Sequence, residues 1–227
     1  MSTPRLCASV AALGLATTLV SCGGDVSLTF RSAVDVQLDT ADFDVPAEYQ
    51  GGGTVTPVPC AGSCPTLSGV TATCVDDVCD PDVISVTVPV GGVVDIEDEV
   101  DAAEGTPLAS VDSVQLLGLS YEVTRNTLGV DLEPVRLFWT TEDDAAGDAL
   151  GDALALFPAV PASELPSGDA SLDDARNAAL TTFFEEGGRR LRFFAEAGTD
   201  LAPGGPLPDG AFDVRLLLRL RVVGSVF

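Results

Sequence analysis

The sequence predicts a mainly β protein built as an antiparallel β-sandwich, with a jelly-roll arrangement as its candidate topology. Apolar and polar residues alternate with a period of two in several stretches, which is typical of strands that bury one face. Segments rich in Gly and Pro, at 51–59, 158–168 and 202–210, are expected to be loops between these strands. A helical pattern occurs only late in the chain. This combination favours two packed sheets with one or two short helices at an end or edge.

The first strand is predicted at 28–38, where apolar residues occupy the even positions until Ser32 and Ala33 interrupt the pattern. Further strands are predicted at 84–90, 117–123, 135–139 and 190–195. The residues of the 117–123 stretch expected to face the core are Leu117, Leu119, Tyr121 and Val123.

The clearest alternation lies near the end of the chain, at 212–222. The residues expected to face the core are Val214, Leu216, Leu218 and Leu220. Arg215, Arg219 and Arg221 then form a cationic outer face. We expect them to pair with acidic residues on a neighbouring strand, since the net charge of the chain disfavours a polyanion there.

Residues 171–186 predict a helix, because Ser171 and Asp174 have the spacing of a capping box and Gly187 supplies a stop. The apolar face of this helix would comprise Leu172, Ala175, Ala179, Leu180 and Phe183. A second helix is predicted at about 143–157, where Pro158 ends it.

The first 21 residues have the composition of a secretory leader. Arg5 provides a positive start, and the uncharged apolar core at 10–20 is shorter than the roughly 20 residues of a membrane span. The motif Leu19-Val20-Ser21-Cys22 resembles the lipobox of bacterial lipoproteins. The resemblance implies that residues 1–21 are removed and that Cys22 is lipidated. The alternative is an ordinary leader with Cys22 beside its cleavage site by chance.

Lipidation would make residues 22–27 a short tether and 28–227 a single β-sandwich domain with an insertion at about 51–82. Because two or more acyl chains bind a bilayer stably, the membrane becomes a partner through the anchor. Gly23, in place of the Asp that favours inner-membrane retention in this class, favours the outer membrane of a bacterial cell envelope.

Four cysteines lie in the insertion, at Cys60, Cys64, Cys74 and Cys79. An even number of cysteines in an exported protein predicts two disulfides, with three pairings open. A zinc site made of four thiolates is the alternative, but thiols outside the cytoplasm are usually oxidised.

The net charge is −24, with 35 acidic residues against 11 basic ones, no Lys and no His. This charge excludes nucleic acid as a direct partner, since each phosphate contact needs a cation. The absence of His excludes Ser-His and Cys-His nucleophiles. Three acidic clusters lie at 76–82, 95–101 and 142–152. Their composition suits Ca²⁺, but none has the spacing of a calcium loop, and solvated surface is the simpler interpretation.

The sequence thus favours a lipid-anchored, non-catalytic envelope protein, structural or protein-binding, with no cofactor and no metal site. An envelope protein or polysaccharide is its expected partner. A Ca²⁺-dependent adhesin or glycan-binding sandwich is the alternative. A hydrolase would need two carboxylates facing each other in a cleft, and no pair is marked in the sequence.

Overall fold

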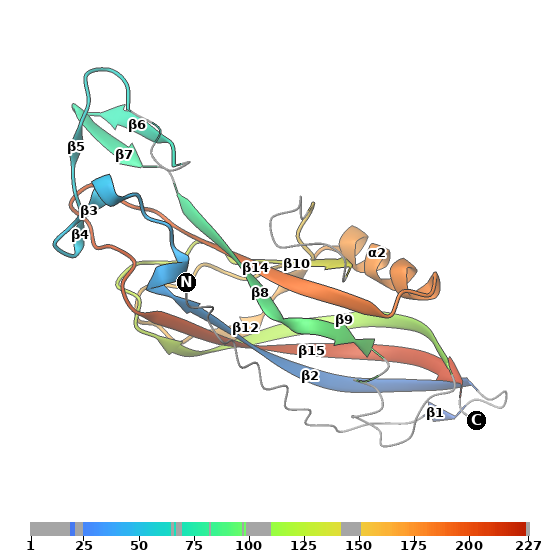
Figure 1. Ribbon diagram of the computed structural model, residues 1–227. Coiled ribbons are helices and arrows are strands. Elements are labelled where there is room, and N and C mark those ends of the chain that lie inside the picture. Colours follow the sequence, from blue (N-terminus) through green and yellow to red (C-terminus); the bar gives the residue numbers. More distant parts are fainter. Residues whose placement is uncertain are drawn as a thin grey trace, which may run out of the picture.

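The protein consists of two antiparallel five-stranded sheets packed face to face, with a small disulfide-bonded sheet at one end (Figure 1). The computed structural model describes residues 19–20, 25–64, 66, 70–81, 83–96, 98, 110–141 and 151–225. The two packed antiparallel sheets confirm the predicted β-sandwich.

The first sheet has the order β1-β2-β15-β9-β12. Its strands are β1 (Leu19–Val20), β2 (Asp25–Asp39), β15 (Ala211–Ser225), β9 (Ser110–Asn126) and β12 (Ser167–Asp169). The second sheet has the order β13-β11-β10-β14-β8. Its strands are β13 (Ser171–Leu172), β11 (Ala155–Leu156), β10 (Arg136–Thr141), β14 (Arg190–Thr199) and β8 (Ile84–Asp95).

The pairing of eight strands gives the jelly-roll topology. In chain order these strands are β2, β8, β9, β10, β11, β12, β14 and β15. The first pairs with the last, the second with the seventh, the third with the sixth and the fourth with the fifth. Such nested pairs form one long antiparallel hairpin, and rolling it up places alternate pairs in opposite sheets, as in a double Greek key.

The core lies between the two sheets and follows the predicted alternation. In β15, Leu216, Leu218 and Leu220 are at most 7% exposed, while Val214 is half-buried. In β8, Ile84 and Val90 are buried as expected. Apolar side chains from both inner faces therefore remove each other from water, which is the main stabilising contribution in a sandwich.

Two details of the predicted strands are wrong. Ser32 does not interrupt the first strand, because β2 is continuous and Ser32 points into the core with only 8% exposure. Leu117 does not face the core. The register between β15 and β9 shifts between Arg219 and Leu220, so Leu117 is left without an opposite residue and lies half-buried on the outer face.

The predicted helix is α2 (Asp174–Glu185), and its cap differs from the expectation. Ser171 belongs to β13, and the Asp173 side chain accepts the capping hydrogen bond from the Arg176 backbone nitrogen at 2.8 Å. The buried residues of α2 are Leu180 and Phe184, whereas Ala175 and Ala179 are exposed and Phe183 is half-buried. The apolar face is therefore rotated from the predicted one.

Helix α2 packs against β9 and the second sheet. The Asn177 side-chain amide donates to the Leu116 carbonyl of β9 at 2.9 Å. The Arg176 guanidinium lies 5.2 Å from the centre of the Trp139 ring of β10, which itself lies 5.5 Å from the Phe183 ring. Contacts near both ends of the helix thus fix it to both layers of the sandwich.

The second predicted helix, 143–157, is wrong over its described part. Residues 142–150 lie outside the described residues, Gly151 has a positive φ of 67°, and Ala155 and Leu156 form the strand β11. Pairing with β10 and β13 on both sides supplies the hydrogen bonds that a helix would have made internally.

The segments predicted as loops hold some short regular structure. The 51–59 region contributes to β3 (Gln50–Gly51), β4 (Thr54–Val55) and β5 (Val58–Pro59), and Ser167 and Gly168 belong to β12. The 3-10 helices η1 (Thr40–Asp42) and η2 (Ala47–Tyr49) precede them. The strands β6 (Ala72–Val75) and β7 (Val78–Pro81) complete a three-stranded sheet with β5.

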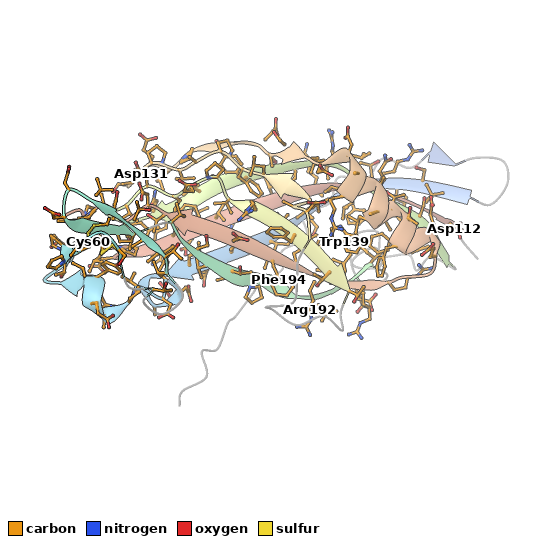
Figure 2. All side chains as sticks on the ribbon, turned by 90° about the horizontal axis from the view of Figure 1, so that it is seen from above. Cys60, Asp112, Asp131, Trp139, Arg192 and Phe194 are labelled. Atoms are coloured by element: carbon orange, nitrogen blue, oxygen red, sulfur yellow. A yellow bond between two sulfur atoms is a disulfide. The ribbon has the colours of Figure 1, made fainter. Side chains whose placement is uncertain are left out.

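The molecule is elongated along its long strands. The start of β2 and the end of β15 lie beside each other at one end, and the sheet of β5, β6 and β7 projects from the other (Figure 1). Seen from above, Cys60 lies near that projecting end and Asp112 near the opposite one (Figure 2). Among the described residues, no helix has the length and apolar character needed to span a bilayer.

We expect the Leu180→Ala variant to lose about 2–5 kcal/mol of unfolding free energy, because it removes a side chain of 2% exposure from the contact of α2 with the core. Urea unfolding followed by circular dichroism measures this loss. The matched control is Leu165→Ala, since Leu165 is 61% exposed and its truncation should change stability by less than about 0.5 kcal/mol. Equal losses in the two variants would contradict the packing of α2.

Candidate functional site

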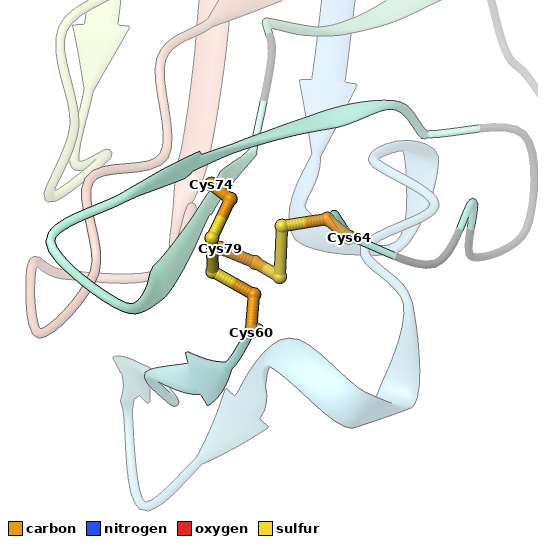
Figure 3. The surroundings of a disulfide bond; sticks show 4 residues. All are labelled: Cys60, Cys64, Cys74 and Cys79. Carbon is orange, nitrogen blue, oxygen red and sulfur yellow. A yellow bond between two sulfur atoms is a disulfide. The ribbon is translucent and has the colours of Figure 1, made fainter. Parts of the chain in front are cut away.

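The four cysteines of the insertion form two disulfides (Figure 3). Cys60 is bonded to Cys74, and Cys64 to Cys79. The two predicted disulfides are therefore present, and their pairing is the crossed one. Cys74 and Cys79 lie opposite each other on β6 and β7, but each is bonded to the segment before β6 instead of to its neighbour. This pairing ties three pieces of chain into one unit.

The zinc alternative finds no support in this arrangement. The sulfurs of Cys60, Cys64 and Cys79 lie within 4.8 Å of one another, but all three are bonded in disulfides. A zinc site requires thiolates. Over the described residues, this is also the one group of three or more Cys, Asp or Glu side chains close enough to hold an ion.

The disulfide-bonded unit is fixed to the sandwich at its base. Cys79 is fully buried, and so is Val55 of the preceding hairpin. The Val55 backbone nitrogen donates to the Gly205 carbonyl and the Gly204 nitrogen donates to the Val55 carbonyl, both at 2.8 Å. These bonds connect the insertion to the loop before β15, so the unit continues the main core.

An exposed two-residue turn, here named the tip, joins β6 and β7 in this unit. Asp76 and Asp77 both have positive φ, 50° and 63°, which is the backbone of a type I′ hairpin turn. The Asp77 carbonyl accepts a hydrogen bond from the Cys60 nitrogen at 3.0 Å. Val75, beside the turn, is 47% exposed. Crosslinks and a hydrogen bond therefore hold two carboxylates and one apolar side chain at this exposed tip.

The acidic clusters do not converge on a site in the described part of the chain. Asp80 is half-buried in β7, and Asp95 lies 3.5 Å from Arg190 in an ion pair. The members that lie outside the described residues are Asp82, Glu97, Glu99, Asp101, Glu142, Asp143, Asp144 and Asp148. Cys22 also lies outside them.

Two of the cavities lie between the sheets and are apolar. One, of about 70 Å³, is lined by residues such as Val90, Leu180 and Phe184; the other, of about 20 Å³, includes Tyr121 and Phe157. Neither contains a carboxylate. A third hollow of about 490 Å³ lies on the outer face of the first sheet and includes the single carboxylate of Asp169.

The outer face of β15 is cationic, as predicted, and part of it is neutralised. Arg215 lies 3.0 Å from Asp35 of β2, and Arg221 donates to the Ser27 hydroxyl at 3.0 Å. At the far end of the strand, two hydrogen bonds from Arg125 to Asp213, and the charge of Asp213, raise the pKa of Arg125. Such exposed pairs contribute at most about 1 kcal/mol each.

Arg219 departs from this pattern, because the residue opposite it on β2 is Arg31. Sequence analysis missed this pair. The alternation shows that both side chains face outward, but the register of β2 against β15 decides that they are neighbours, and register between distant strands cannot be derived from periodicity.

Comparisons with protein-family models, with curated proteins and with solved structures found no match to this chain.

Removing the first disulfide, in a Cys60→Ala/Cys74→Ala variant, should cost about 3 kcal/mol, because a loop of about 15 residues becomes free in the unfolded chain. Urea unfolding combined with hydrogen exchange of the β6 and β7 amides measures the effect. As a control, a reducing agent should destabilise the unmodified protein more than the variant, which has one disulfide left to lose. Identical midpoints under oxidising conditions would argue against this disulfide.

We also expect Asp77→Gly to stabilise the tip by about 0.5–1 kcal/mol. Glycine adopts positive φ without the steric cost of a side chain, and this gain exceeds the entropy that glycine adds to the unfolded state. Asp80→Gly is the matched control, since Asp80 lies within β7 and glycine weakens a strand interior. Thermal unfolding should place the two variants on opposite sides of the parent, and the same direction for both would refute the turn geometry.

Proposed function

We propose that the protein is a bacterial envelope lipoprotein, anchored through lipid on Cys22, that acts without catalysis as a structural or protein-binding module. The lipobox-like motif before Cys22 and the two disulfides, which are stable in oxidising compartments, support this proposal. The further observation in the fold that supports it is the distance between the start of β2 and the disulfide-bonded tip.

An anchor at Cys22 would fix one end of the long axis to the bilayer. β2 begins at Asp25, so only residues 23 and 24 separate the anchor from the sheet. The 15 residues of β2 then run the length of the first sheet, a distance of about 50 Å at about 3.3 Å per residue. The turn between β6 and β7 lies beyond the far end of β2 (Figure 1). A short tether thus still places the tip well away from the membrane.

Processing at Cys22 is compatible with the fold. It would remove β1, whose two residues pair only with Val26 and Ser27 at the start of β2. The rest of β2 pairs with β15 over its whole length and does not depend on β1. The sandwich therefore keeps its central pairings in the processed chain.

The tip is the surface that this orientation presents to a partner protein. Two disulfides reduce the ordering entropy that binding would otherwise cost, which is a general advantage of preorganised contact surfaces. The exposed Val75 offers a small apolar contact next to the carboxylates of Asp76 and Asp77. A partner with a basic rim around an apolar contact would complement it.

The anchor is tested by changing the cysteine. In a bacterial host that processes lipoproteins, the parent chain should fractionate with membranes, and its intact mass should show a chain that starts at a lipidated Cys22. Cys22→Ser should abolish lipidation, because the thioether needs the sulfur. Cys7→Ser is the matched control, since Cys7 lies within the leader and should leave anchoring unchanged. An unmodified thiol at Cys22, or a retained leader, would disprove the proposal.

A further inference from the structure

The outer face of the first sheet holds a hollow of about 490 Å³, within the range of small-molecule sites. Its polar lining is Arg31, Arg219, Ser120 and Asp169, and its apolar lining includes Leu117 and Leu217. β2, β15, β9 and β12 each supply part of it, so the rigid centre of the sheet forms its floor.

The two arginines lie where their like charges repel each other. Arg31 and Arg219 lie directly opposite each other on β2 and β15, where the α-carbons of paired residues are about 4.5–5.5 Å apart. Like charges in this position repel. In the described part of the chain, Arg31 forms no hydrogen bond or ion pair, and Arg219 donates only to the Leu117 carbonyl, at 3.3 Å. Four residues earlier in β15, Arg215 is matched with Asp35, so the sheet does accommodate paired charges.

The backbone beneath Arg219 shapes the hollow. The register shift between β15 and β9 brings the Leu117 carbonyl to the Arg219 guanidinium and turns the Leu117 side chain outward. The next residue is Gly118, and a β-carbon there would lie 3.5 Å from Nη2 and 3.8 Å from Nε of Arg219. The guanidinium therefore lies along a strip of bare backbone. The register shift and Gly118 together orient the Arg219 side chain. An arginine that only adds charge to the surface requires neither.

We propose that this hollow binds a single sugar unit that carries one anionic group, a carboxylate or a phosphate. Arg31 and Arg219 provide several N–H donors to one anionic oxygen group, and that group relieves their repulsion. Asp169 accepts hydrogen bonds from sugar hydroxyls, Ser120 adds a hydroxyl, and the leucines contact the apolar face of the ring.

The surrounding charge sets the size of the ligand. With a net charge of −24, the protein repels long polyanions, and the cost rises with each added negative charge. One anionic unit fits within the field of the two arginines, whereas a continuous polyanion extends into the field of the acids around them. The site therefore favours a chain end or an isolated acidic residue of a saccharide. This inference does not depend on the lipid anchor.

The test is an NMR titration of the purified full chain with galacturonic acid, galactose 6-phosphate, galactose and inorganic phosphate. At least one of the two anionic sugars should saturate in the low millimolar range, and which of them does so distinguishes carboxylate from phosphate. Galactose and inorganic phosphate should each bind at least about tenfold weaker, a difference of about 1.4 kcal/mol. Binding of inorganic phosphate as tight as that of the anionic sugars, or no saturation by either sugar, would overturn the proposal.

Arg219→Gln and Arg31→Gln should each weaken binding at least tenfold while leaving the melting temperature unchanged or higher, because either change removes the repulsion. Arg215→Gln is the matched control, with the same charge change on the same face, and should leave affinity within about twofold. A melting temperature lowered by both Arg219→Gln and Arg31→Gln would assign the pair a structural role. Equal weakening by Arg215→Gln would show general attraction in place of a site.

Discussion

The pairing of β15 with β2 on one side and β9 on the other is the constraint on which the rest of the structure depends. β15 is paired with β2 along its whole length and with β9 from Phe212 to Ser225, and it lies beside the start of β2 at its end. Its inward residues meet the second sheet, and its outward residues form the cationic face. Because the contacts of this strand join residues that are far apart in sequence, no local segment reproduces the fold by itself.

The sequence indicates the individual strands of this architecture but not which strands pair with each other. Residues 212–222 could be predicted as a strand with its buried face, because alternation within one strand is a local signal. The jelly-roll order could only be named as a candidate, since it depends on which strands pair. Ser32 shows the limit within a strand: a polar residue on the inner face looks like an interruption, whereas pairing with β15 keeps the strand continuous.

The candidate sites also combine local features that the sequence shows with strand pairings that it does not show. Four cysteines behind a leader-like segment predict two disulfides, yet the crossed pairing of Cys60 with Cys74 depends on how β6 and β7 fold back on the preceding segment. The hollow could not be foreseen at all. It requires the register that opposes Arg31 to Arg219 and a bulge that turns Leu117 outward, and a one-residue change in either would remove it.

The repulsion between Arg31 and Arg219 persists because the core determines the register. Relieving it by sliding β15 one residue along β2 would turn Leu216, Leu218 and Leu220 to the solvent, and each buried leucine contributes about 1.5–3 kcal/mol. Opposed exposed charges cost about 1 kcal/mol or less. The strand therefore keeps its register and keeps the two guanidinium groups together. A sheet can in this way hold a charge arrangement that is unfavourable by itself, and an anion between the two guanidinium groups would remove their repulsion.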